Sequence, residues 1–298
     1  MLFPEQQRQN NPNLCFNWFS PGDNRRDAGE ALSIRQMVAA VTARHGLDPA
    51  RVFVTGLSAG GAMTSVMLAA YPEVFAGGAI IAGLPYGCAN TVPQAFDRMR
   101  GHGMPRGSEL AALVRGASGH DGPWPTVSIW HGTADATVSH GNAQAIIDQW
   151  RPLHGAAAAP DHVETVGGHA RRAWTDGTGR EVIEEYTIVG MGHGTPLDTL
   201  SEDGCGASGA YMLEANISST QLICRFWGLA QDGAKPVAKV AAEPARAPLE
   251  KVPVGYAIGE AMAPIFTHRP SGHSHNAQRS SGVRKVIEDA LRAAGLMR

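Results

Sequence analysis

A serine placed between glycines is the first residue of this chain whose setting predicts chemistry. Ser58 lies in GLSAG, residues 56–60, which matches the pattern G-x-S-x-G. The run 51–55 before it is typical of a strand, and the run 59–70 after it is typical of a helix. Such a turn exposes the serine hydroxyl, so Ser58 is a candidate nucleophile and the N–H of Ala59 a candidate oxyanion donor. The alternative is that Ser58 only caps the helix.

A nucleophilic serine needs a general base and a carboxylate that orients the base. Asp135 follows the predicted strand 126–130, and His193 lies in the loop GMGHG, residues 190–194, after another predicted strand. The chain order Ser, Asp, His is the order of α/β-hydrolases. We therefore predict a triad of Ser58, Asp135 and His193. In the alternatives, Asp135 caps a turn and His193 is a surface histidine. His131 precedes the acid loop and is expected to brace it.

The elements that must position these residues alternate between strands and helices. That alternation predicts an α/β fold with a doubly wound, mostly parallel sheet. A surface excursion is expected over 100–121, and Asp176-Gly177 is a turn signal between the last two strands. Further strands are predicted at 78–81, 126–130, 163–166 and 181–189, and helices at 31–44, 143–150 and 218–229.

Composition changes toward the C-terminus and divides the chain into three parts. Residues 1–232 are the predicted catalytic domain. Residues 233–270 hold an Ala- and Pro-rich stretch that is typical of a linker. Residues 271–298 form a C-terminal segment with apolar residues at helical spacing, which predicts a short amphipathic helix.

Charge and hydropathy exclude several classes of function. The formal net charge of −2 gives no basis for binding nucleic acid, and no apolar run is long enough to span a bilayer. The first residues, MLFPEQQRQNN, lack the pattern of a signal peptide. The four cysteines show no zinc-like spacing, so no metal site is predicted. They are either buried thiols or members of one or two disulfides.

Five blocks of sequence resemble the polyhydroxybutyrate depolymerase family of esterases, which is related to feruloyl and acetylxylan esterases. The blocks are LCFNWF (14–19), TGLSAGGAM (55–63), AGLPYGCA (82–89), IWHGTAD (129–135) and GMGHG (190–194). The resemblance runs from about Phe3 to Leu229. It implies an α/β-hydrolase with Ser58 as nucleophile, Asp135 as acid and His193 as base, acting on carboxylic esters without a cofactor. It also implies an extracellular location.

The same resemblance implies how the cysteines would pair if they are oxidised. Cys15 would bridge to Cys88, and Cys205 and Cys224 would form the remaining pair. A count of four free thiols under denaturing, non-reducing conditions would reject both bridges.

One feature departs from the family pattern. Ser58 comes so early that the strands and the His-Gly loop expected before it, with its second oxyanion N–H, are not in this sequence. The sheet is therefore expected to be incomplete at its N-terminal side, with one edge unpaired. Losing one oxyanion donor costs about 10²–10³ in kcat. We expect weak activity or poor stability, which robust p-nitrophenyl butyrate turnover by the folded monomer would contradict.

The substrate is less defined than the chemistry. Trp18 and Tyr86 are candidate substrate-binding aromatics, with core packing as the alternative. A polyhydroxyalkanoate polymer or oligomer is the expected substrate; a feruloyl or acetylated polysaccharide ester is the alternative. Two further hypotheses are a non-catalytic binding protein on a hydrolase scaffold and a serine peptidase. Oligomeric state is left open.

Overall fold

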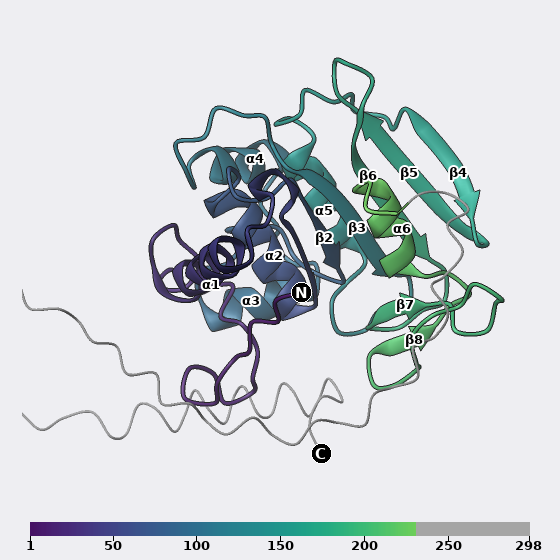
Figure 1. Ribbon diagram of the computed structural model, residues 1–298, viewed down its shortest axis with the longest axis horizontal. Helices are drawn as coiled ribbons and strands as arrows, with labels where there is room; N and C mark the ends of the chain where they lie inside the picture. Colours follow the sequence, from purple (N-terminus) through teal and green to yellow (C-terminus); the bar gives the residue numbers. More distant parts are fainter. Residues whose placement is uncertain (231–298) are drawn as a thin grey trace, which may run out of the picture. The chain divides into compact units, whose positions relative to one another are not determined.

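A six-stranded sheet runs through the protein, seen in a computed structural model that describes residues 1–230 (Figure 1). The predicted linker and C-terminal helix lie outside these described residues. The strands lie in the order β1-β2-β3-β6-β5-β4, and the first four of these are mutually parallel. They are β1 (Phe53–Leu57), β2 (Gly77–Ile81), β3 (Thr126–Gly132), β4 (His162–Val166), β5 (His169–Thr175) and β6 (Glu181–Ile188).

The central strands are apolar because both of their faces are covered. All residues of β2 and β3 are buried, as parallel strands between two layers require. Successive side chains point to opposite faces. Ile129 therefore belongs to the larger core, with Ile80 and Ile183, whereas Trp130 belongs to a smaller core on the other face, stacked on Tyr186 at 3.8 Å.

The helices divide unequally between these two faces. The larger core includes buried residues of five helices, and the smaller core includes Ile223 of the last helix in the described residues, which passes over β3 and β6 in Figure 1. The helices are α1 (Gly29–His45), α2 (Ala59–Ala70), α3 (Val92–Met99), α4 (Gly107–Arg115), α5 (Gly141–Trp150) and α6 (Ser219–Phe226), with a short 3₁₀ turn at Pro49–Arg51.

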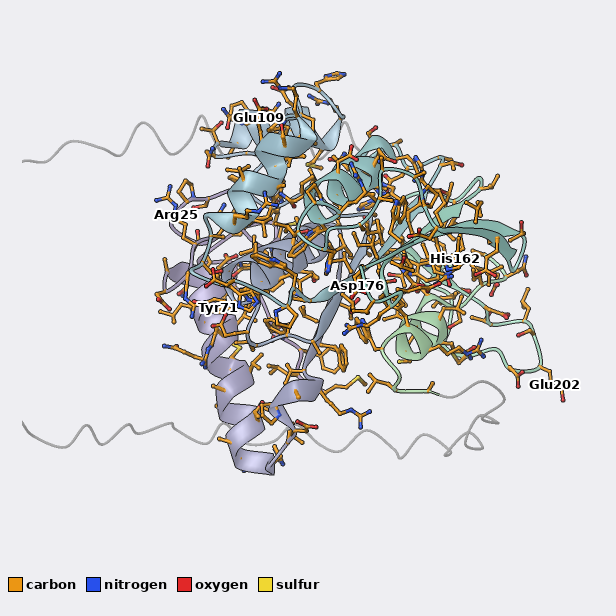
Figure 2. The ribbon with its side chains drawn as sticks, turned by 90° about the horizontal axis from the view of Figure 1, so that it is seen from above. Arg25, Tyr71, Glu109, His162, Asp176 and Glu202 are labelled. Carbon is orange, nitrogen blue, oxygen red and sulfur yellow. The ribbon has the colours of Figure 1, made fainter. Side chains whose placement is uncertain are left out.

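Helix α2 carries the residue after the candidate nucleophile and lies deep in the core. Its residues 61–70 are all buried, which its small side chains and methionines allow. The helix ends at Ala70, and the hydroxyl of the next residue, Tyr71 (labelled in Figure 2), accepts a hydrogen bond from the Asp27 N–H at 2.7 Å. The guanidinium of Arg26 lies over the same ring at 4.8 Å. These contacts fix α2 against the segment that precedes α1.

Two antiparallel strands extend the sheet beyond β6, and one of them, β5, is missing from the sequence prediction. The Asp176 turn joins β5 to β6 rather than β4 to β6 (Figure 2). The motif HARRAWT of β5 lacks clear alternation, but its arginines find partners on β6: Arg171 bonds Glu184 at 2.9 Å, and Arg172 bonds Glu185 at 3.0 Å. These ion pairs form only once the strands are side by side.

The predicted surface excursion over 100–121 is wrong in its middle. Helix α4 forms there and buries Leu110, Ala111 and Val114, and of these Leu110 and Val114 belong to the larger core. Its Glu109 side chain accepts a hydrogen bond from the Arg106 N–H at 2.8 Å, which helps to start the helix. The surrounding glycines masked this short amphipathic pattern. Helix α3 and the small parallel pair β7 (Thr195–Leu197) and β8 (Met212–Glu214) were also not predicted.

Strand β1 lies at an edge of the sheet, as expected. It pairs only with β2 among the described strands, and it begins two residues later than predicted because Arg51 belongs to the 3₁₀ turn. Trp227, just after α6, stacks on Phe53 with ring centroids 4.6 Å apart. The sheet is mostly parallel and carries helices on both faces, which confirms the predicted fold class.

All four cysteines are free in the structure, so neither predicted bridge is present. Cys15 is exposed and its thiol contacts the Asn13 carbonyl at 3.7 Å, whereas Cys88 is buried in the larger core. Burial raises the pKa of the Cys88 thiol to about 12. In residues 1–230, no helix has both the length and the apolar character needed to cross a membrane.

Candidate active site

Ser58 stands on a strained turn between β1 and α2. Its backbone has φ 59° and ψ −119°, a conformation that residues other than glycine rarely adopt. Two glycines make the turn possible: a Cβ on Gly56 would lie 2.3 Å from the Gly60 carbonyl carbon, and one on Gly61 would lie 2.9 Å from the Ile81 carbonyl oxygen. This strand–turn–helix geometry is that of a nucleophile elbow.

The Ser58 hydroxyl does not cap the helix that follows it. The Ser58 carbonyl accepts the first helical hydrogen bond from the Ala62 N–H at 2.9 Å, but its side chain makes no capping bond. The simple capping alternative is therefore wrong. Ala59 is the first residue of α2, where backbone N–H groups have no partner within the helix. Its N–H thus stands beside the half-buried hydroxyl, as an oxyanion donor would.

Asp135 binds both its own loop and the predicted base. Its Oδ1 accepts hydrogen bonds from the N–H groups of Thr137 at 2.8 Å and Val138 at 2.9 Å. Its Oδ2 lies 2.7 Å from Nδ1 of His193. The turn-capping alternative and the triad prediction are therefore both true of this side chain, each through a different oxygen.

The environment of Asp135 keeps it ionised. Burial by itself would raise the pKa of this carboxyl group, because its side chain is fully buried. Hydrogen bonds from His131, His193 and the Val138 N–H outweigh burial and hold the pKa well below its usual range. A fixed negative charge therefore faces the ring of His193.

The loop of His193 is tied to the acid loop through the backbone. The Ala134 N–H donates to the Met191 carbonyl at 3.0 Å, and the Gly190 N–H donates to Thr133 Oγ1 at 2.9 Å. The approach is so close that a Cβ on Gly132 would lie 2.2 Å from the Met191 oxygen. His193 is therefore held in place and is not a free surface side chain; its side chain is 9% exposed.

The three predicted triad residues share one edge of the sheet. Ser58, Asp135 and His193 follow the carboxyl ends of β1, β3 and β6, and parallel strands end at the same edge. Backbone hydrogen bonds cross this edge from strand to strand. They run from Ser58 N to Ile81 O at 2.9 Å, from Ala82 N to Trp130 O at 2.8 Å and from Thr133 N to Ile188 O at 3.0 Å.

The structure joins His193 to Asp135 but makes no hydrogen bond between Ser58 and His193 within residues 1–230. In enzymes without substrate, the bond between nucleophile and base is often long and shortens only when substrate binds. The geometry thus supplies an oriented imidazole and a half-buried hydroxyl at one edge, an arrangement compatible with acyl transfer.

Both predicted substrate-binding aromatics lie in the core. Trp18 is 6% exposed and meets Phe19 edge to face at 5.5 Å, and Tyr86 is 9% exposed. This burial favours a packing role for the two rings, and a role in substrate binding stays a prediction. Tyr86 belongs to the loop after β2, which continues along the same sheet edge as the triad residues.

Sequence reasoning missed the side chain that holds this loop. Gln149 of α5 is fully buried, accepts a hydrogen bond from the Tyr86 N–H at 2.9 Å and donates to the Tyr86 carbonyl at 2.9 Å. It also donates to the Leu110 carbonyl at 3.1 Å. The only signal in the sequence is a lone amide among the apolar residues of a predicted helix.

The fold and the site define a class of protein, an α/β-hydrolase with a serine elbow and a histidine–aspartate pair. A family model described as Esterase PHB depolymerase matches residues 1–174, and the chain belongs to this family. The matched region includes Ser58 and Asp135 but ends before His193.

Curated relatives point to the same family. The chain is 47% identical over 231 residues to the poly(3-hydroxyalkanoate) depolymerase C of Paucimonas lemoignei, which covers 77% of this chain and 56% of that protein. It is 31% identical over 207 residues to feruloyl esterase B of Talaromyces funiculosus, which covers 66% of this chain and 57% of that protein. The chain thus spans little more than half the length of these relatives.

A solved structure supports the fold. The acetyl xylan esterase from Aspergillus awamori superposes with a TM-score of 0.59 at 24% sequence identity, covering 72% of this chain and 73% of that chain. This likeness concerns the fold alone, and it agrees with the predicted α/β-hydrolase architecture.

Proposed function

We propose that this protein is a serine esterase that hydrolyses carboxylic esters through an acyl-enzyme. The observation that carries the proposal is the 2.7 Å contact between Nδ1 of His193 and Oδ2 of Asp135, at the same sheet edge as the strained elbow of Ser58. Each of these features has a cost, since a strained backbone and a buried charge both disfavour folding. Their occurrence together is explained by a catalytic role.

The proposed reaction begins with attack of Ser58 Oγ on the ester carbonyl carbon. Nε2 of His193 takes the hydroxyl proton, and the Asp135 carboxylate stabilises the imidazolium that forms. The Ala59 N–H binds the developing oxyanion. The tetrahedral intermediate collapses, the C–O bond breaks, and His193 gives its proton to the leaving alcohol. Water then attacks the acyl-enzyme by the same route and releases the acid.

The proposed substrate is a polyhydroxyalkanoate polymer or oligomer. Its support is the relationship to the depolymerase from Paucimonas lemoignei, at 47% identity, compared with 31% for the feruloyl esterase. Feruloyl and acetylxylan esters are the second candidates. Hydrolysis rates on a 3-hydroxybutyrate oligomer, a feruloyl ester, an acetylated xylan and a peptide would rank these substrates, and a preference for the peptide would contradict the esterase proposal.

Reactivity of Ser58 is the first test of the proposal. A fluorophosphonate probe should label the wild-type chain and leave Ser58→Ala unlabelled, with the label found on the peptide that contains residue 58. Ester turnover should fall by about 10⁴-fold or more in the same variant, because nothing else can form the acyl-enzyme. A folded wild-type protein that takes no label would instead support the non-catalytic binding alternative.

The extracellular location remains part of the proposal. It is tested by comparing the culture medium and the cell fraction of a producing strain. The predicted disulfides are tested separately. Four free thiols on denaturation without reductant would agree with the structure and reject both bridges.

A further inference from the structure

His131 lies against the carboxylate that orients the proposed base. It belongs to β3, four residues before Asp135, and both side chains are fully buried. Its Nε2 is 2.8 Å from the Val138 carbonyl oxygen and 3.5 Å from Oδ2 of Asp135. A carbonyl oxygen can only accept a hydrogen bond, so Nε2 of His131 must carry a hydrogen.

The hydrogen on Nε2 is directed to the Val138 carbonyl, and the same nitrogen lies 3.5 Å from the oxygen that Asp135 offers to His193. Oδ2 therefore has two imidazole neighbours, Nδ1 of His193 at 2.7 Å and Nε2 of His131 at 3.5 Å, while Oδ1 accepts the two backbone N–H groups of its loop. Without His131, Oδ2 would lose this polar neighbour, and the carboxylate would be held only by its loop and by His193.

We infer that His131 is a positioning residue of the active site: it holds the Asp135 carboxylate and the Val138 carbonyl in one arrangement, and so fixes the direction of the His193 ring. This inference rests on the proposed function, since it assigns His131 a task in the same triad. His131 touches neither substrate nor reacting atoms, so it acts only through Asp135.

The groups that face His131 from other elements within residues 1–230 make no hydrogen bond to Asp135. The ring of His140 lies 5.5 Å away at an interplanar angle of 76°. Burial, with a contribution from His131, lowers the pKa of His140. The charges of Glu185 and Arg172 neutralise each other through a 3.0 Å ion pair. In the described residues, Nδ1 of His131 has no hydrogen-bond partner, so Val138 and Asp135 set the orientation of the ring.

The first experiment determines which ring nitrogen of His131 carries the hydrogen, in the wild-type protein without substrate. Nitrogen NMR correlation of the histidine rings should show the Nε2–H tautomer for His131 at pH 8. It should also show a strongly deshielded Nδ1–H proton for His193. The Nδ1–H tautomer at His131 would overturn the inference, and it would do so whether or not the protein hydrolyses esters.

The second experiment tests whether the contact matters for turnover. His131→Leu removes the donor, and His131→Gln keeps an N–H that can reach Val138 and Asp135. We expect kcat of the Leu variant to fall about tenfold with KM unchanged, because a small misplacement of the base slows chemistry without altering binding. The Gln variant should recover most of this loss, and the deshielded His193 proton should be lost in Leu and kept in Gln.

His140→Leu is the matched control, because it removes a neighbouring imidazole that makes no hydrogen bond to Asp135. It should keep both kcat and the deshielded His193 resonance. A folded Leu variant at position 131 with wild-type kcat and an unchanged resonance would overturn the inference. So would equal effects of the substitutions at 131 and 140, which would indicate general packing. If His131→Leu does not fold, the Gln variant and the wild-type tautomer still decide the question.

Discussion

The nucleophile elbow and the acid–base pair are held by different kinds of contact. The elbow is built from residues 56–61, where the chain folds back on itself so closely that a Cβ on Gly56 would meet the Gly60 backbone at 2.3 Å. The pair joins Asp135 to His193, which are 58 residues apart on two separate loops. The elbow therefore depends on glycines, which have no side chain to obstruct the turn, and the acid–base pair depends on charges and hydrogen bonds. Substitutions should affect the first sterically and the second electrostatically.

Asp135→Asn should give the largest effect on the acid–base pair. The amide removes the charge that stabilises the imidazolium and orients the wrong histidine tautomer, so kcat should fall by about 10⁴-fold. Labelling by a fluorophosphonate should slow in parallel. Steady-state kinetics of the folded variant provide the measurement, and a loss below tenfold would remove Asp135 from the triad.

The pH dependence of the free energy of unfolding distinguishes the effect of Asp135→Asn from that of a substitution in the elbow. The pKa of Asp135 is lowered in the folded protein, so its ionised form stabilises the fold above its ordinary pKa of about 4. This contribution is lost as pH falls through the folded-state pKa. Chemical denaturation should therefore show Asp135→Asn less stable than wild type at pH 7, by about 1–3 kcal/mol, with a smaller difference at pH 3. An elbow variant should show the same deficit at both pH values.

Gly56→Ala should be the most damaging change in the elbow. The new Cβ would overlap backbone atoms that cannot move without distorting the turn of Ser58, so we expect a loss of about 10²-fold or more in kcat/KM together with reduced stability. Gly60→Ala is the matched control, since its Cβ would have open space. The control should keep activity and gain about 0.5–1 kcal/mol, as alanine replaces glycine within α2. Similar behaviour of the two variants would contradict the steric account of the elbow.

Gly132→Ala tests the backbone approach that positions the base. Its Cβ would lie 2.2 Å from the Met191 carbonyl oxygen, so the loop of His193 must shift. A shift of about 1 Å at a catalytic group can cost up to about 10²-fold in kcat, and we expect a loss of that order with little change in KM. Gly192→Ala, beside His193 but with open space at its Cβ, should stay close to wild type. A harmless Gly132→Ala would show that the loop is not held by this approach.

Tyr86→Phe should have the smallest effect. The loop after β2 lies between β1, which leads to the elbow, and β3, which leads to Asp135. Gln149 fixes this loop through the Tyr86 backbone, which the substitution leaves intact. We expect kcat and KM within about twofold of wild type, because removing a hydroxyl that makes no hydrogen bond to the described residues is a minor change. A clear rise in KM for a hydroxyalkanoate oligomer would instead give Tyr86 a part in substrate binding.

The sequence predicted well what local pattern controls. Helix α2 begins and ends at the predicted residues, and the elbow around Ser58 has the strand–turn–helix setting that GLSAG indicated. The strands that end before Asp135 and His193 were also predicted, because both are rich in β-branched and aromatic residues. Chain order then predicted which acid and base to join.

Other parts of the molecule have no strong local signal. Strand β5 is stabilised by the ion pairs of Arg171 and Arg172 with β6, and helix α4 by packing against α5 and the core. A pattern of a few residues cannot reveal partners that come from distant parts of the chain. For the same reason, Gln149 and the cysteine pairings could not be settled from sequence spacing.

The sequence by itself therefore determined the residue types of the site, their order, and the strained turn at Ser58, since that turn needs only nearby glycines and a strand followed by a helix. The tertiary structure alone decided that Oδ2 of Asp135 meets His193 with His131 beside it, that Gly132 lies against the base loop, and that Trp18 and Tyr86 are buried. The physical reason is distance along the chain: hydrogen bonds and close packing between separate loops exist only after the sheet has brought those loops to one edge.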